Sequence, residues 1–581
     1  AQWKREKPLT IGEHGGMWYV CPQNASAYVG LQAYDGFEPC AIGFALKERL
    51  FQEDARRKGI SGISTFNFAY YFTRSMPDED VYVTDAPFKK IPKYSLTINN
   101  GYLKDYPMFR ENPLMPFMRE AYRAVTIINR EYNKNFYSSK PLVRHFDVYN
   151  DTLSAHDVSV GYTFTFGGKT TVGEKTFRQN PAELYILGLE LPIPEISEKT
   201  AATLVLTLSH DGNEVFSREW SYNFYPESIK TEKKISSPVY FYGDEGYEYV
   251  AALSKNAKKI ASLDEADPDG IIVLGAHLPD DANTLADALG RYVYAGGRLV
   301  VLEQSTMGIG NLSLTNRDFF SAHSSNPDHP LLKNICDDDM IFWGPSITED
   351  RPEPIIHRNY LKAKGGEYTF VLESDAGDYA DGGDLWSPLM TMEHGAGRVI
   401  LCQLELCENY ENVPQACVLL SNILSYADER PVREYKKLYA LGKRAEEFAS
   451  SLGVKYDAGI SADDCGVILA DIGNADENEI KALLSGGKTV VTLPLDESGC
   501  DKLARITGEK ITLIPREVSQ VKPCVTSDVI ENISIIDLFR YDKVPMSPRP
   551  VAVSIFGSSL PVRGELSKIL TAPSGSAGTM A

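Results

Sequence analysis

The stretch Pro8-Leu9-Thr10-Ile11-Gly12-Glu13-His14-Gly15-Gly16 begins the part of the sequence that most constrains the fold. Its apolar run predicts a strand, and its glycines predict a turn at the carboxyl end of that strand. A helical pattern runs from residue 41 to about 57, and residues 60–68 predict a second strand. Because a strand–helix–strand order needs a crossover connection, we expect the two strands to pair in parallel.

From residue 141 to about 230 the apolar period changes to two, which is typical of half-buried strands. Residues 143–149 and 158–166 alternate in this way, and so does the run at 202–208. His210-Asp211-Gly212-Asn213 follows the last of these runs and is a hairpin signal. This pattern predicts an immunoglobulin-like β-sandwich.

Residues 236–430 and 431–581 carry two copies of one α/β pattern. The matching segments are 270–274 with 466–470 and 296–301 with 486–491, and later strands of the first copy are expected at 368–372 and 398–402. Continuous apolar runs of this kind are typical of parallel strands that are buried on both faces. We therefore predict two tandem doubly wound, flavodoxin- or amidotransferase-like domains, of which the second is a truncated repeat of the first.

Composition and charge limit the partners of this chain. Its 581 residues exceed what a single core holds, so about three or four domains are expected. The formal net charge of −20 opposes binding to nucleic acid and to anionic lipid. No run approaches the roughly 20 apolar residues of a membrane helix, so we predict no membrane span. Nine cysteines without a CxxC pair and nine histidines without HxH or HExxH spacing predict no metal site, and no motif predicts a cofactor.

The first α/β copy does not carry the motif of a cysteine-dependent enzyme. Such an enzyme needs a cysteine on a strand-to-helix turn, whereas the corresponding strand continues into Leu302-Glu303-Gln304-Ser305. The Gly296-Gly297 turn precedes a strand rather than a helix, so it does not fit a phosphate-binding loop. We expect a non-catalytic scaffold that covers a neighbouring domain or mediates self-association, which allows a homo-oligomer.

Glu13 is the candidate catalytic residue. It stands at the carboxyl end of the first predicted strand, which is the end at which barrel enzymes place their catalytic groups. The flanking glycines let a substrate approach the backbone, and the aromatic residues Trp18 and Tyr19 follow closely. A strand-end glutamate is also often a hydrogen-bonded structural residue, and the residues alone leave both interpretations open.

Residues 7–15 resemble the nucleophile strand of glycoside hydrolase family 2, the β-galactosidase and β-glucuronidase family. Residues 59–68 resemble its eighth barrel strand, although that strand usually ends in Trp where this chain has Phe66-Asn67-Phe68. Residues 144–152 resemble the first strand of the sandwich that follows the barrel. The resemblance implies the last two βα units of a (β/α)8 barrel in residues 1–140, followed by an immunoglobulin-like sandwich in residues 141–230.

By the same resemblance Glu13 is the catalytic nucleophile, and His14, Trp18 and Asn67 bind the substrate. A structural role is the alternative for each of these three. The implied activity is that of a retaining hydrolase that removes terminal β-linked sugars, of the galactoside or glucuronide type, from oligo- or polysaccharides. Retention needs a second carboxylate as acid/base, which the family carries on the fourth barrel strand.

We therefore expect this chain to be the C-terminal portion of a larger carbohydrate-active enzyme. By itself it should be inactive, because the acid/base carboxylate would lie upstream of Ala1. A periplasmic or secreted location is favoured over a cytoplasmic one. The alternative is a non-catalytic carbohydrate-binding or assembly protein built on the sandwich and the α/β domains.

Overall fold

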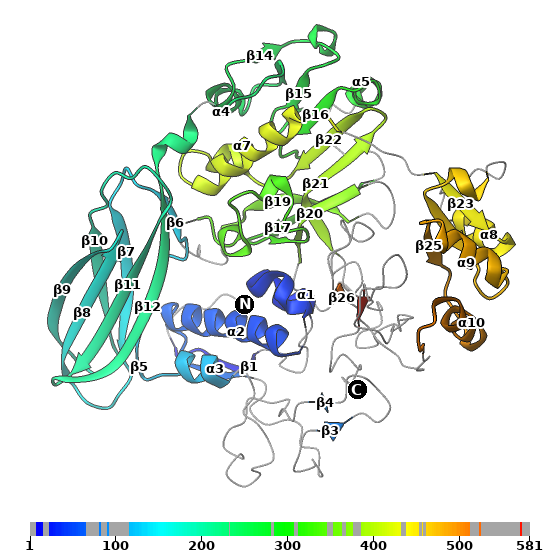
Figure 1. Ribbon diagram of the computed structural model, residues 1–581. Coiled ribbons are helices and arrows are strands. Elements are labelled where there is room, and N and C mark those ends of the chain that lie inside the picture. Colours follow the sequence, from blue (N-terminus) through cyan, green and yellow to red (C-terminus); the bar gives the residue numbers. More distant parts are fainter. Residues whose placement is uncertain are drawn as a thin grey trace. The chain divides into compact units, whose positions relative to one another are not determined.

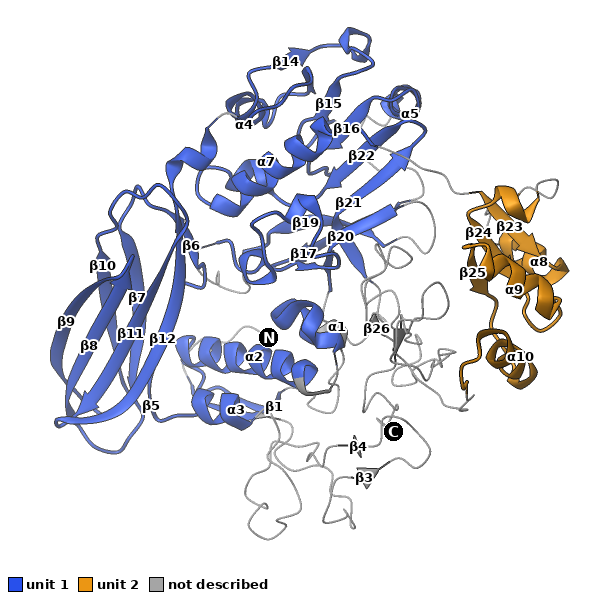
Figure 2. Ribbon diagram, viewed as in Figure 1, with its two compact units in different colours: residues 1–78, 93–431 blue, residues 79–92, 432–581 orange. Residues whose placement is uncertain are grey.

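A computed structural model gives the fold of the chain, which divides into two compact units (Figure 2). Unit 1 comprises residues 1–78 and 93–431, and unit 2 comprises residues 79–92 and 432–581. The structure describes residues 7–14, 22–35, 37–65, 81–82, 90–91, 115–231, 233–279, 284–306, 312–344, 353–362, 368–375, 385–431, 437–451, 456, 461–511, 522–523 and 570–571. The chain is multidomain, with mixed α/β and all-β parts, as predicted.

Unit 1 begins with a strand–helix–strand element (Figure 1). Its members in chain order are β1 (Thr10–His14), α1 (Pro22–Val29), the 3-10 helix η1 (Gly30–Tyr34), α2 (Phe37–Arg57) and β2 (Gly62–Thr65). β1 and β2 pair in parallel, which confirms that prediction. Helix α2 begins before residue 41 because Pro39 lies in its first turn, where a missing N–H is tolerated. The further assignment to a (β/α)8 barrel stays a prediction.

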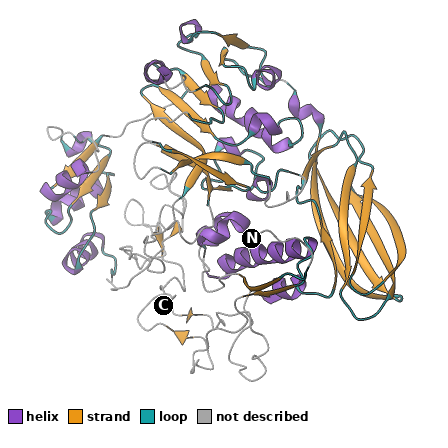
Figure 3. Ribbon diagram, turned by 180° about the vertical axis from the view of Figure 1, so that it is seen from behind, coloured by secondary structure: helices purple, strands orange, loops and turns teal. Residues whose placement is uncertain are grey.

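The middle of unit 1 is a β-sandwich whose two sheets share one core (Figure 3). Its strands are β5 (Val125–Asn129), β6 (Asn135–Tyr137), β7 (Leu142–Asn150), β8 (His156–Phe166), β9 (Lys169–Gln179), β10 (Glu183–Leu191), β11 (Thr200–His210) and β12 (Asn213–Tyr225). One sheet has the order β10-β7-β5 and the other β6-β12-β11-β8-β9. The period of two places Leu204, Leu206 and Leu208 of β11 in the shared core. The immunoglobulin-like topology stays a prediction.

The sandwich begins earlier in the chain than the apolar pattern indicated. β5 pairs with β7, and β6 pairs with β12, although both strands precede residue 141. The expected boundary at residue 141 therefore falls inside the pair of sheets. The sequence of residues 75–140 predicts one or two short strands but does not place them, because strands of five and three residues are too short for an alternation to be recognised. Helix α3 (Met115–Ala121) precedes them.

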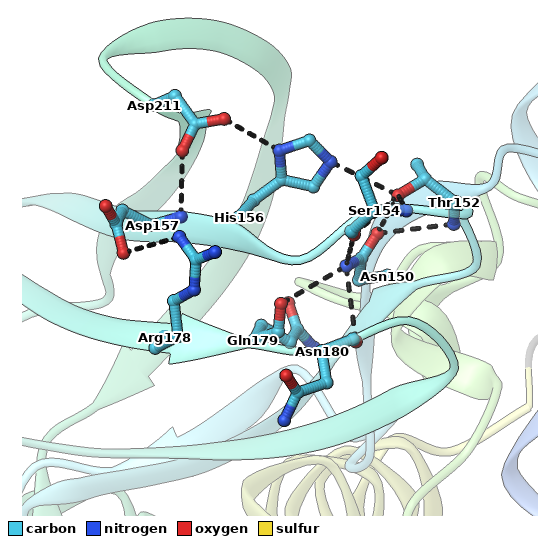
Figure 4. A network of polar contacts seen from close by, with 9 residues as sticks. All are labelled: Asn150, Thr152, Ser154, His156, Asp157, Arg178, Gln179, Asn180 and Asp211. Atoms are coloured by element: carbon cyan, nitrogen blue, oxygen red, sulfur yellow. Dashed lines mark hydrogen bonds and ion pairs between the residues drawn. The ribbon is translucent and has the colours of Figure 1, made fainter.

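A network around Asn150 closes one end of the sandwich (Figure 4). The Asn150 side chain is fully buried, and its Nδ2 donates to the carbonyl oxygens of Ser154 (2.9 Å) and Asn180 (3.2 Å). Its Oδ1 accepts a hydrogen bond from the Thr152 hydroxyl at 2.6 Å. His156 contacts that hydroxyl through Nε2 at 3.2 Å. The turn between β7 and β8 is therefore hydrogen-bonded to the end of β9 through Asn150.

The last part of unit 1 is a mixed sheet, of which five strands are parallel. These are β13 (Val239–Tyr242), β14 (Ala257–Ile260), β15 (Ile271–Leu274), β16 (Arg298–Val301) and β22 (Gly397–Cys402). Their spatial order, β14-β13-β15-β16-β22, is the 2-1-3-4-5 order of flavodoxin-like sheets. Ile271 and Val273 enter one core, and Ile272 and Leu274 enter the core on the other face. The continuous apolar run in β15 therefore reflects burial on both faces. The associated helices are α4 (Tyr247–Leu253), α5 (Ala286–Tyr294), α6 (Leu406–Asn409) and α7 (Pro414–Asp428).

The prediction that the strand at 368–372 belongs to a parallel sheet is wrong. This strand is β20 (Tyr368–Ser374), and it pairs antiparallel with β21 (Trp386–His394). β21 in turn is antiparallel to β22, because the connection at residues 395–396 is too short for a crossover. The other members of this antiparallel part are β17 (Leu314–Phe319), β18 (His323–Ser324) and β19 (Ile356–Leu361). An apolar run indicates burial but not strand direction.

Unit 2 contains a three-stranded parallel sheet of β23 (Leu438–Leu441), β24 (Val467–Ala470) and β25 (Thr489–Thr492). Its helices are α8 (Lys443–Ser451), α9 (Glu477–Ser485) and α10 (Glu497–Thr507), and short strand pairs are β3 (Val81–Tyr82) with β4 (Lys90–Ile91) and β26 (Lys522–Pro523) with β27 (Leu570–Thr571). The order β23-β24-β25 repeats β13-β15-β16, and the first residues of the strands are paired in both. A helix joins the second and third strands in each case. The assignment of unit 2 as a truncated repeat stays a prediction.

Candidate active site

Glu13 lies at the carboxyl end of β1, where the pairing with β2 is irregular. Gly12 and Glu13 lie together opposite a single residue of β2, so β1 carries one extra residue. An extra residue of this kind is a β-bulge, and bulges re-aim side chains at the rims of barrels and next to active sites. Glu13 is exposed at this bulge, as a group that meets a substrate must be.

His14 lies next to Glu13 in the chain but faces helix α2. Its Nε2 is 3.1 Å from Oε2 of Glu48, which is within ion-pair distance although the two groups are not aligned for a hydrogen bond. Its ring stacks on that of Phe51, with centroids 3.4 Å apart and planes 9° from parallel. Glu13, by contrast, is exposed. These are the contacts of a packed histidine, and a role of His14 in substrate binding stays a prediction.

The other two predicted substrate-binding residues, Trp18 and Asn67, lie outside the described residues. Of the candidate site the structure therefore places Glu13 and His14, as neighbours on β1. Glu48 also belongs to the surroundings of His14, and the sequence pattern did not indicate it. It is fully buried on α2, at the helical spacing that places a side chain on the face covering the strand.

A second polar cluster, also missed by sequence reasoning, lies at the carboxyl edge of the parallel strands. Glu303 follows β16, Glu405 follows β22 and His277 follows β15. His277 Nε2 lies 3.7 Å from Glu405 Oε2, and its Nδ1 lies 3.0 Å from the Ser305 hydroxyl. His277 has a φ of 51°, a left-handed conformation that is strained for a side chain of this size. The available signal was the change from apolar to polar residues at the end of each strand.

Burial and neighbouring carboxylates shift the pKa values of this cluster. Burial, with the nearby Glu405 carboxylate, raises the pKa of Glu303 to about 7. The nearby Glu405 carboxylate raises the pKa of His277 above its ordinary value. Burial raises the pKa of the Cys407 thiol far above its ordinary value, so this thiol stays protonated and unreactive. The non-catalytic role expected for the α/β domain stays a prediction.

Neither a metal centre nor a membrane helix is found in the described part of the chain. No group of three or more His, Cys, Asp or Glu side chains within the described ranges is arranged to hold a metal ion. None of the helices within the same ranges is both long and apolar enough to cross a bilayer.

Comparison with known proteins gives weak structural similarities and nothing else. No protein-family model matches the chain, and no curated protein matches it. A calcium-binding mutant of β-glucuronidase 2 from Bacteroides uniformis is 13% identical over 32% of this chain and 24% of that chain, with a TM-score of 0.14. A putative β-galactosidase from Bacteroides fragilis is 13% identical over 31% of this chain and 34% of that chain, also with a TM-score of 0.14.

Proteins of other classes reach the same level of similarity. The alkylpurine DNA glycosylase AlkC of Pseudomonas fluorescens is 12% identical over 20% of this chain, with a TM-score of 0.14. This chain spans 39% of the length of AlkC and 50% of that of the sporulation control protein Spo0M of Bacillus subtilis. TM-scores of this size do not establish a common fold.

Proposed function

We propose that this chain is part of a retaining glycoside hydrolase in which Glu13 is the catalytic nucleophile. The observation that carries the proposal is the position of Glu13, an exposed carboxylate at a bulge on the carboxyl end of a parallel strand. That end of each strand bears the catalytic groups of (β/α)8 barrels. The substrate class is a terminal β-linked sugar of the galactoside or glucuronide type.

In this mechanism the Glu13 carboxylate attacks the anomeric carbon as the bond to the leaving oxygen breaks, which forms a glycosyl-enzyme. A second carboxylate, about 5–5.5 Å away on another barrel strand, protonates the leaving oxygen. It then takes a proton from the water that releases the sugar. His14 has a supporting role, because its contacts with Glu48 and Phe51 hold the end of β1 against α2.

The test uses the polypeptide in which this sequence is joined to the remaining barrel strands, assayed with aryl β-galactosides and β-glucuronides. Glu13→Gly should lower turnover by more than about 1,000-fold, because the attacking group is lost. Sodium azide should restore product formation in this variant as an α-glycosyl azide, since a small anion enters the space of the lost carboxylate. Glu190→Gln, which changes an exposed carboxylate of the sandwich, is the matched control and should leave turnover unchanged.

Two results would overturn the assignment. Near-wild-type turnover of Glu13→Gly would exclude Glu13 as the nucleophile. If Glu13→Gly is inactive and azide does not restore product formation, the glutamate has a structural role. The carbohydrate-binding or assembly protein would then be the better interpretation of the chain.

A further inference from the structure

The segment that joins the Glu13 strand to helix α2 is anchored on the mixed sheet of unit 1. Asp375, which directly follows β20, accepts hydrogen bonds from the Ser26 hydroxyl of α1 and from the Tyr34 hydroxyl of η1, the latter at 3.2 Å. All three side chains are buried, with exposures of 2% for Ser26, 0% for Tyr34 and 5% for Asp375. One carboxyl group therefore joins two turns of the α1–η1 segment to a strand end more than 300 positions away in sequence.

A second contact brings the backbone of the same segment against the sheet region. Gly30, the first residue of η1, has a φ of +60°, and a Cβ at this position would clash with the carboxylate of Asp337. Asp337 begins the 3-10 helix η6 (Asp337–Met340), and its other oxygen accepts a hydrogen bond from the backbone N–H of Ser324 at 2.6 Å. Only glycine fits so close an approach in this conformation. The segment is therefore held at Ser26, Gly30 and Tyr34.

The groups around Asp375 make this anchor neutral near pH 7. Burial, assisted by Glu373 on β20, raises the pKa of Asp375 to about 8, against the lowering effect of Ser26, Tyr34 and Lys362. Lys362 is itself paired with Glu373 at 2.5 Å. His323 on β18 is fully buried, and burial lowers its pKa to about 4, so it adds no charge at neutral pH. An uncharged carboxyl group carries a smaller desolvation cost here than the ionised form.

We propose that Asp375 is a positioning residue of the glycosidase site, through which the mixed α/β sheet holds the α1–η1 segment and with it the end of β1. The proposal rests on the proposed function of Glu13. Connections that follow barrel strands form the catalytic face of such enzymes. A displacement of about 1 Å far from the reacting atoms can lower turnover by about 100-fold. The α/β part is then a component of the active enzyme rather than an independent accessory.

Hydrogen exchange on the present chain tests the anchor without any activity. Asp375→Ala should speed exchange of the backbone amides of residues 22–34 by at least about 10-fold at pH 7, because both hydroxyl donors lose their acceptor. Asp375→Asn keeps an uncharged acceptor of the same shape and should exchange like the wild type. Asp244→Ala, which removes a 98% exposed aspartate of the same α/β part, is the control and should change nothing in residues 22–34. Unchanged exchange in β15 and β16 shows that the sheet remains folded in each variant.

Kinetics of the complete enzyme test the positioning role. Asp375→Ala should lower kcat by about 10- to 100-fold with a smaller change in KM, and Asp375→Asn should restore it at pH 7. If Asp375→Ala does not fold, Tyr34→Phe removes one of the two donors and keeps the ring.

Unchanged exchange of residues 22–34 in Asp375→Ala would overturn the anchor. Faster exchange with unchanged kcat would overturn the positioning role and leave the proposed function standing. A Glu13→Gln enzyme with full turnover would instead overturn the proposed function, and hydrogen exchange would still decide whether Asp375 is the anchor.

Discussion

Glu303 shows how far one side chain in this protein departs from its behaviour in water. It is 2% exposed, and its Oε1 accepts a hydrogen bond from the backbone N–H of Cys407 at 2.8 Å. Its Oε2 has no hydrogen-bond partner among the described residues, and the like charge of Glu405 lies nearby. Both burial and repulsion favour the protonated carboxyl, so the folded state keeps a proton that the unfolded chain releases.

This difference predicts a pH dependence of stability. The pKa of Glu303 is about 7 in the folded protein against 4.5 for an ordinary glutamate, so between these values the folded state binds more protons. The free energy of unfolding should therefore fall as pH rises from 4.5 to 7, by about 1.4 kcal/mol per pH unit from this group. Glu303→Gln, which keeps an acceptor for Cys407, should flatten this fall in urea titrations, whereas exposed Glu190→Gln should not. If the free energy of unfolding of Glu303→Gln falls equally steeply with pH, a group other than Glu303 binds this proton.

At the scale of elements, ion pairs connect the end of helix α2 to the sandwich. Arg57 lies 3.4 Å from one oxygen of Asp147, and Arg130 lies 2.6 Å from the other. Arg56, one residue earlier on the helix, pairs with Asp151 at 2.6 Å. Asp147 is fully buried, so each of its oxygens needs the partner it has. The strand–helix–strand element and the sandwich are therefore joined through β7.

Removal of the shared carboxylate should destabilise the protein strongly. Asp147→Ala removes the carboxylate that Arg57 and Arg130 share, and loss of one partner of a buried ion pair costs about 3–5 kcal/mol. Asp157→Ala is the control, because Asp157 and its partner Arg178 are exposed, and it should cost less than about 1 kcal/mol. Guanidinium unfolding curves of the two variants make the comparison. Equal effects of the two substitutions would show that the α2–sandwich contact adds nothing to stability.

Element types could be predicted where the apolar pattern is long enough. Helix α2 and strands β8 and β11 have many residues of one period, and their types are as expected. The three-residue strand β6 is too short to show a period, so the sequence predicts a short strand in this segment without placing it. For β20 the sequence predicted a strand correctly but predicted a parallel direction, which is wrong. The direction of a strand depends on the length of the connection to the strand with which it pairs.

At the scale of the whole molecule, the two units have separate cores. The core of unit 2 includes Leu441, Ile468, Ile480 and Leu483, and none of these residues belongs to a core cluster of unit 1. Because each unit has a core of its own among the described residues, each can lose its packing separately. Unit 2 should therefore unfold as its own cooperative step.

Calorimetry of the whole chain should accordingly resolve at least two transitions. Ile480→Ala removes a side chain that is 1% exposed in the unit 2 core, at a cost of about 2–5 kcal/mol. It should lower the Tm of one transition and leave the others in place. Ile272→Ala, an equivalent change in a core of unit 1, should shift a different transition. A single transition that moves as a whole in both variants would contradict independent unfolding.

By itself the sequence determined the type of the longer helices and strands, that two α/β patterns recur in it, and that Glu13 stands near the end of a strand. These properties are local, since hydrophobic period and turn residues act over a few neighbouring positions. Only the tertiary structure decided that Asp375 meets Ser26 and Tyr34, that Glu303 lies near Glu405, and that β20 runs antiparallel. A hydrophobic pattern specifies that a side chain is buried but not what it is buried against. Partners separated by hundreds of residues are set by packing of the whole chain.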